Sequence, residues 1–209
     1  MRVFRSERMI DKGIDILVVV FGILIALSID NYRDYKKAEE QWNMFASQVR
    51  ADAEFFKQSF TNIEAFYSDK FNKTKEWIGK LEKTNVSIKE MEPFLVSLGN
   101  VQIDYPKNTI YEALVQTSNP FLINDTEKLQ AMGMFYSFED QALSNIRVIS
   151  EHFIPEYRKI IKRFYSKKSD PNLREDIIFL LYSYTRYSGH SQIMYKRQLE
   201  RTENLLSHL

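Results

Sequence analysis

The sequence predicts an all-α protein: an N-terminal transmembrane helix continues into a long helix, followed by an up-and-down helical bundle with a small cap of short helices. Three observations support this fold class. The 209 residues include only 6 Gly and 5 Pro, the residues that punctuate β-rich folds. Residues 16–27 are uniformly apolar, and between Trp42 and Tyr67 apolar residues recur at helical spacing.

The length fits one folded domain, or one domain with an anchor, and the composition excludes several kinds of function. The 29 Lys and Arg residues balance 28 Asp and Glu residues, so the chain lacks the basic excess that binding to nucleic acid requires. The absence of cysteine excludes disulfides, thiolate metal sites and cysteine nucleophiles. In a helical protein, we expect the 15 Phe, 12 Tyr and 2 Trp residues to fill the core.

The first predicted element is a transmembrane helix at residues 13–31. No polar stripe interrupts residues 16–27, so the helix would be apolar on every side, unlike a surface helix of a soluble protein. The apolar run from Ile14 to Ile29 contains Asp15 and is shorter than the about 20 residues of a typical span. The alternatives are a signal peptide cleaved near residues 26–28 and a buried core helix.

The basic residues that flank this segment predict its orientation. Four Lys and Arg residues precede the span within residues 1–12, and three follow it within residues 33–37. Because cytoplasmic flanks carry the larger number of bases, we expect residues 1–12 in the cytoplasm. Residues 32–209 would then form a helical domain on the other side of the membrane.

Five residues in or beside the span are candidates for contacts with the membrane or with a partner: Asp15, Gly22, Asp30, Asn31 and Tyr32. Asp15 either reaches water at the membrane interface or makes a polar contact with a partner helix. Gly22 would let another helix backbone approach closely.

The run DILVVVFGILIALSIDNY, at residues 15–32, resembles the start of a bacterial domain-of-unknown-function family that is abundant in the Bacteroidetes. Members typically read G-E-I-x-L-V-V-I-G-I-L-I-A-L-x-I-N-N-W, followed by a charged helix. This sequence has Asp15, Phe21, Asp30 and Tyr32 where the family has Glu, Ile, Asn and Trp, and its first glycine, Gly13, falls one residue early.

A second likeness to the same family lies further along the chain. It joins residues 109–114, 122–124, 128–129 and 135–136, which are similar to the family pattern Y-x-x-L…L-I-x-N…L…Y-Y. The resemblance therefore covers most of the chain. It implies an inner-membrane protein with a periplasmic helical domain, and the family offers no established activity.

A long bundle helix is predicted after the span. Phe45, Phe55 and Phe66 widen its apolar seam, which is typical of a helix with neighbours on two sides rather than of a bare coiled coil. No Gly or Pro separates Asp30 from Gly79, so the transmembrane helix is expected to continue rigidly into this one. The seam follows a repeat of 3.5 residues and consists of Trp42, Ala46, Val49, Ala53, Phe56, Phe60, Ile63 and Tyr67.

Residues 85–125 predict a compact cap of short pieces. Ser87 begins a capping-box pattern, and a short helix is expected from about Glu92 to Leu98. Residues 101–105 read as extended, and a second short helix is expected at residues 109–117.

Two more long helices are predicted in the second half. The first starts near Thr126 and reaches Phe164, and Pro155 should kink or break it near Phe153. The last begins at Pro171 and runs to the C-terminus, with Gly189 as a point where it could bend.

No motif for catalysis or for phosphate or dinucleotide binding occurs in the sequence. His152 and Glu156 have the spacing of two metal ligands on one helix face, but Pro155 disturbs that geometry. We therefore expect a charged surface turn there. The sequence predicts no enzyme, no metal and no cofactor.

Arg158, Lys159, Lys162 and Arg163 form a candidate basic patch. Such a patch could contact anionic lipid, polysaccharide or an acidic protein surface. The alternative is a solvated helix face whose charges are balanced by nearby acids.

These features together predict a membrane-anchored periplasmic scaffold, or an accessory subunit of an envelope complex, that acts through protein contacts. The expected partners are membrane lipid and either another membrane protein or further copies of the chain, without nucleic acid. Two alternatives remain: an extracytoplasmic ligand-sensing bundle that works with a membrane partner, and an enzyme of unfamiliar type.

Overall fold

Every regular element in the described part of the chain is helical, which confirms the predicted all-α class. The computed structural model describes residues 3–83, 86–116, 126–166 and 170–209, and it describes side chains from Val18 onward except at positions 110 and 114. The α-helices are α1 (Val3–Lys83), α2 (Glu92–Ser97), α3 (Thr109–Gln116), α4 (Thr126–Tyr136), α5 (Phe138–Val148), α6 (Ile154–Phe164) and α7 (Leu173–His208). A 3₁₀ helix, η1 (Ile88–Met91), precedes α2, and a π-helix, η2 (Ile149–Phe153), joins α5 to α6.

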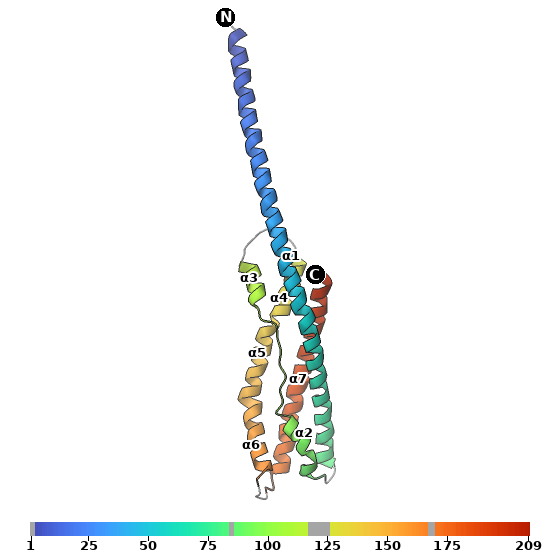
Figure 1. The fold of residues 1–209 in the computed structure, drawn as a ribbon. Helices are drawn as coiled ribbons and strands as arrows, with labels where there is room; N and C mark the ends of the chain where they lie inside the picture. Colours follow the sequence, from blue (N-terminus) through green and yellow to red (C-terminus); the bar gives the residue numbers. More distant parts are fainter. Residues whose placement is uncertain (1–2, 84–85, 117–125, 167–169) are drawn as a thin grey trace.

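Helix α1 is one uninterrupted helix of 81 residues, as the absence of proline predicts. At 1.5 Å per residue it is about 120 Å long. Its C-terminal half packs lengthwise against α7, which runs in the opposite direction (Figure 1). All eight residues of the predicted seam are buried or half-buried, so the sequence located this face of α1 correctly.

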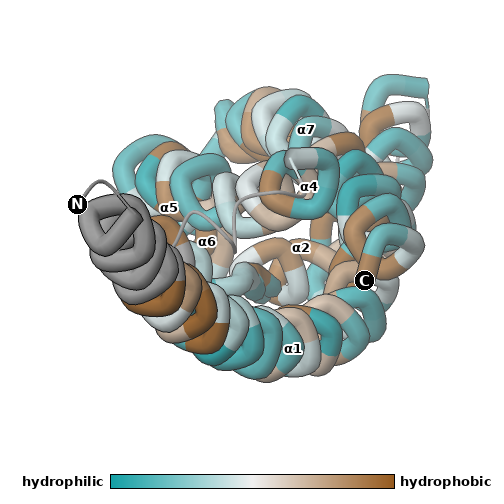
Figure 2. Tube along the Cα trace, turned by 90° about the horizontal axis from the view of Figure 1, so that it is seen from above, coloured by the Kyte–Doolittle hydropathy of each residue, from teal (hydrophilic) through white to brown (hydrophobic). Residues whose placement is uncertain are grey.

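The N-terminal half of α1 projects beyond the bundle (Figure 1). Ala38 is the first buried residue of the described side chains. Residues 18–37, hereafter the projecting segment, are all exposed. Hydrophobic stretches, coloured brown, are visible along α1 next to its grey N-terminal part in the view from above (Figure 2). Among the described residues, no helix combines the length and the apolar character needed to cross a membrane.

The short elements within residues 86–116 do not form one compact cap, which corrects the prediction for this part of residues 85–125; residue 85 and residues 117–125 lie outside the described residues. Helix α2 lies at the end of the bundle farthest from the N-terminus, whereas α3 lies near the opposite end, and an extended stretch joins them along the bundle (Figure 1). The stretch at residues 101–107 stays extended because Val101, Ile103 and Tyr105 pack against the core. Helices α2 and α3 themselves begin and end close to the predicted residues.

Two buried tyrosines satisfy the backbone of this extended stretch. The Tyr67 hydroxyl donates to the Gln102 carbonyl oxygen at 2.8 Å, and the Asp104 amide donates to the Tyr195 hydroxyl oxygen at 3.1 Å. Such partners are needed because an extended segment inside a helical bundle has no neighbouring strand to pair with.

The predicted long helix from Thr126 to Phe164 is divided into several elements, which corrects a second expectation. A turn at Ser137 separates α4 from α5. Near Phe153, where the sequence predicts a kink or break, the helix does not end but changes type: the π-helix η2 ends at Phe153 and α6 follows at once, with Pro155 in its first turn. Proline has no N–H to donate to the preceding turn, and a widened π-turn accommodates the lost bond.

Helix α7 begins two residues later than predicted. Pro171 and Asn172 form a turn, and the Asp170 carboxylate accepts a hydrogen bond from the Asn172 amide at 3.2 Å. The helix then continues through Gly189 without interruption to His208.

Aromatic side chains fill the core, as their number predicts. Phe60 of α1, Phe138 of α5 and Tyr195 of α7 are fully buried, and their ring centroids lie 5.3 to 5.8 Å apart. Edge and tilted contacts of this kind add stabilisation beyond the burial of apolar area. The cluster fixes the position of α5 against the α1–α7 pair.

Candidate functional site

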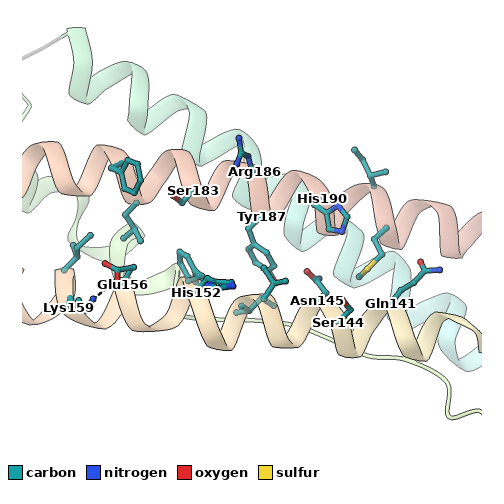
Figure 3. A pocket seen from close by; sticks show the side chains of 18 of the residues that line it. Gln141, Ser144, Asn145, His152, Glu156, Lys159, Ser183, Arg186, Tyr187 and His190 are labelled. Carbon is teal, nitrogen blue, oxygen red and sulfur yellow. Dashed lines mark hydrogen bonds and ion pairs between the residues drawn. The ribbon is translucent and has the colours of Figure 1, made fainter.

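A groove with a volume of about 1420 Å³ lies between two antiparallel walls of the bundle. One wall is formed by α5, η2 and α6 and the other by α7, and all of the lining residues come from these elements (Figure 3). We call it the α5–α7 groove. It reaches from Asp140 and Arg197 at one end to Arg163 and Asp176 at the other.

The floor of the groove is apolar and its edges are unusually apolar for an exposed surface. Ile149, Ile160 and Leu180 are buried in the floor. At the edges, Phe179 is 73% exposed and Ile193 is 53% exposed. Exposed apolar side chains that adjoin an apolar floor are typical of a surface that binds another molecule.

A chain of hydrogen bonds runs from the floor of the groove into the core. The Asn145 amide donates to the Ser191 hydroxyl at 3.1 Å, and Ser191 hydrogen-bonds Tyr187. The Tyr187 and Tyr67 hydroxyl oxygens lie 2.8 Å apart. These partners are buried and joined, so they hold α5, α7 and α1 together.

Burial raises the pKa of Tyr67 and Tyr187 above the ordinary tyrosine value. For Tyr67, the neighbouring Tyr187 raises the pKa further, whereas the hydrogen bonds that Tyr187 shares with Tyr67 and Ser191 lower the pKa of Tyr187. Both tyrosine hydroxyls therefore stay protonated at neutral pH. The row of hydrogen bonds from Asn145 to Tyr67 thus has a structural role.

The charged side chains around the groove leave an excess of positive charge. Lys159 pairs with Glu156 at 2.6 Å, and Arg163 pairs with Asp176 at 2.6 Å and with Asp170 at 2.7 Å. The hydrogen bond from Arg163 lowers the pKa of Asp170. The remaining charged residues of the lining, which have no ion-pair partner among the described residues, are Lys162, Arg186, Arg197 and Asp140.

The two residues with metal-ligand spacing, His152 and Glu156, both lie in the groove (Figure 3). Glu156 is engaged by Lys159. Within the part of the chain that the structure describes, no group of three or more His, Cys, Asp or Glu side chains is arranged to hold a metal ion. The arrangement instead suits binding of an apolar surface flanked by negative charge.

The structure divides the predicted basic patch. Lys159, Lys162 and Arg163 line the groove, whereas Arg158 is exposed and lies outside its lining. The ion pairs of Lys159 and Arg163 match the alternative in which nearby acids balance the patch.

The predicted membrane and partner contacts lie apart from the groove. Asp30, Asn31 and Tyr32 are exposed on the projecting segment, and a Cβ atom added at Gly22 would meet nothing within 4 Å. Asp15 lies outside the residues whose side chains are described.

Sequence reasoning missed the contribution of α7 to the groove. Phe179, Arg186 and Ile193 follow one another at intervals of seven residues and line one wall. This spacing places them on one helix face, beside the buried face that holds Leu181 and Tyr195. The repeat is visible in the sequence, but it indicates a binding surface only when the structure shows that no other helix covers this face of α7.

Comparison with protein-family models, with curated proteins and with solved structures finds no match to this chain.

Proposed function

We propose that the protein is a single-pass inner-membrane protein whose helical bundle lies in the periplasm and acts by contact, as a scaffold or an accessory subunit of an envelope complex. In this proposal the protein is not an enzyme. The observation that carries it is the uncovered apolar surface of α1 between Val18 and Ile29.

Four consecutive residues establish that this surface is uncovered on every side. Successive residues of an α-helix point about 100° apart, so Val18, Val19, Val20 and Phe21 together face all directions. They are 64%, 60%, 45% and 62% exposed, respectively. A helix that is apolar all round is a helix buried in a protein core or in a membrane, and no element of the bundle covers this one in the described residues.

Lipid is the cover that the sequence favours. The apolar run extends toward the N-terminus to Ile14, and bilayer thinning or interfacial side chains can absorb a short span at modest cost. The excess of bases before the run favours a cytoplasmic N-terminus. The resemblance of residues 15–32 to the Bacteroidetes family supports the same topology.

Two features of the bundle support a contact function. The uninterrupted helix α1 would hold the bundle at a fixed distance from the membrane, and the α5–α7 groove offers an apolar surface to a partner.

Membrane extraction tests the anchor. The full chain should stay in the membrane pellet after alkaline carbonate treatment, and a Leu24→Arg substitution should release most of it, because an Arg near the centre of a span costs about 3 kcal/mol or more. Phe55→Arg is the matched control, since Phe55 is 66% exposed on the bundle half of the same helix. Complete release of the unaltered chain by carbonate would refute the anchor.

Protease accessibility tests the orientation. In spheroplasts, protease added outside should digest the bundle and leave a fragment that contains the N-terminal residues. Protection of the bundle in intact spheroplasts, with digestion only after lysis, would reverse the proposed topology.

A ligand-sensing bundle is the second candidate, and the apolar floor of the α5–α7 groove favours it. In that case a small amphiphile would bind in the groove and raise the unfolding temperature of the full chain. A screen that finds only protein partners would favour the scaffold.

A further inference from the structure

The geometry points to a specific occupant for the α5–α7 groove: an acidic amphipathic α-helix of a partner protein, laid between α7 and the α5–α6 wall. This inference names the class of partner for the contact function proposed above and rests on that function. It does not depend on the membrane anchor.

The dimensions of the groove fit a helix. Its α7 wall runs from Asp176 to Arg197, which corresponds to about 32 Å at 1.5 Å per residue. The volume of about 1420 Å³ exceeds the roughly 300–1,000 Å³ of typical small-molecule pockets. A groove that is this long and bounded by two helices suits a third helix, which would bury its apolar side against the floor.

The side chains along the groove fit the apolar stripe of such a helix. Phe179 and Ile193 stand 73% and 53% exposed near the two ends of the α7 wall, and Val148 is 50% exposed on the opposite wall. Between them, Tyr187 lies across the floor (Figure 3). Phe179 and Ile193 are about 21 Å apart along α7, so a helix whose apolar positions i, i+3, i+4 and i+7 repeat over at least two heptads would cover these side chains.

The charges select an acidic partner. Three basic residues line the groove without an ion pair among the described residues: Lys162, Arg186 and Arg197. Asp140 is the one acidic residue of the lining that also lacks an ion pair there. Glu or Asp residues that flank the apolar stripe of the incoming helix would meet these bases. Two copies of this chain packed groove to groove would instead place like charges together, so a second copy in that arrangement is disfavoured.

Peptide binding tests the inference on the purified full chain in detergent. The probe is a labelled synthetic helix of about 21 residues, which matches the length of the groove. It carries Leu at the positions that would face the floor of the groove and Glu on both sides of this stripe. A second peptide carries Lys in place of every Glu. Fluorescence anisotropy should give saturable binding of the acidic peptide, at least about tenfold tighter than that of the basic one.

Substitutions locate the binding. Phe179→Ser and Ile193→Ser should each lower the affinity for the acidic peptide several-fold. Phe55→Ser replaces an exposed aromatic residue on α1 and should leave this affinity unchanged. Arg197→Glu should weaken it, whereas Lys196→Glu should not, because Lys196 is exposed on the same helix but lies outside the groove. Circular dichroism of each variant verifies that the bundle stays folded.

Three outcomes would overturn the inference. The first is no saturable binding of the acidic peptide, and the second is equal affinity for the acidic and basic peptides. The third is saturable binding of palmitate that Phe179→Ser abolishes while neither peptide binds, which would assign the groove to a fatty acid. Carbonate extraction is unaffected by any of these results, so failure of the groove and failure of the anchor are distinguishable.

Discussion

The hydroxyl oxygens of Tyr67 and Tyr187 lie 2.8 Å apart in the interior of the bundle. Tyr67 donates its hydroxyl hydrogen to the Gln102 carbonyl oxygen. Because a tyrosine has one such hydrogen, Tyr187 is the donor between the two rings. One pair of hydroxyls thus connects α1, α7 and the extended stretch that joins α2 to α3.

Replacing Tyr67 with Phe should lower the free energy of unfolding by about 1–3 kcal/mol. The change would remove the acceptor of the buried Tyr187 hydroxyl and the donor to the part-buried Gln102 carbonyl oxygen, and an unsatisfied buried group carries that cost. Urea denaturation of the variant and the unaltered chain would measure the difference.

Tyr184→Phe is the matched comparison. Tyr184 is fully buried, and its hydroxyl oxygen has no hydrogen-bond partner among the described residues. Its removal should leave the stability unchanged or raise it by about 1 kcal/mol. Equal losses in the two variants would contradict the hydrogen-bond assignment.

The bundle should lose stability steeply above about pH 10. Burial raises the pKa of Tyr67, Tyr136, Tyr184, Tyr187 and Tyr195 above the ordinary value near 10. Below that pH, each is protonated in both states and contributes no pH dependence. Above it, tyrosines of the unfolded chain ionise while the buried ones stay protonated, so unfolding releases protons and becomes easier as the pH rises.

The slope has a limiting value of about 1.4 kcal/mol per pH unit for each such tyrosine. Thermal unfolding followed by circular dichroism from about pH 8 to pH 11 would measure it. The part of the tyrosinate absorbance that comes from these five residues should appear together with unfolding. Ionisation of these tyrosines in the folded protein near pH 10 would refute the prediction.

Gly79→Ala should stabilise the protein by about 0.5–1 kcal/mol, because glycine inside a helix costs about this much relative to alanine. A Cβ atom at position 79 of α1 would meet nothing within 4 Å. At Gly189 of α7, the same substitution would place the Cβ atom 3.0 Å from the Phe71 ring, so the gain should be cancelled or reversed. Thermal melts of the two variants provide the comparison.

Phe60→Ala should cost about 3–5 kcal/mol, since truncating a buried aromatic residue leaves a cavity. Phe60 is fully buried against Phe138 and Tyr195. Phe55→Ala should change the stability by no more than about 0.5 kcal/mol, because Phe55 is exposed on the same helix. Chemical denaturation that gave similar losses would contradict the assigned core.

Local patterns predicted most of the helices because their causes are local. The seam from Trp42 to Tyr67 is a periodicity within one helix, and Pro155 interrupts hydrogen bonding within one turn, so both could be read from neighbouring residues. The division at Ser137 lacked such a signal, because no Gly or Pro marks it.

The groove could not be predicted because it depends on contacts between distant parts of the chain. Its walls come from residues 140–163 and 176–197, and their alignment is set by packing such as that of Phe138 against Tyr195. The misplaced cap has a similar cause: the extended stretch depends on Tyr67 and Tyr195, which lie far away in the sequence.

The unbroken course of α1 from Val3 to Lys83 has a mechanical consequence. A continuous helix behaves as a rigid rod. The direction in which Gly22 and Tyr32 point around the helix axis is therefore set by the packing of the other half of α1 against α7. One alanine inserted near Ala38 would rotate the N-terminal half of α1 by about 100° about the helix axis and shift it by about 1.5 Å along that axis. Seven inserted alanines would restore the original direction almost completely. An insertion series at this point would therefore change the direction in which the upper face points while leaving the core below intact.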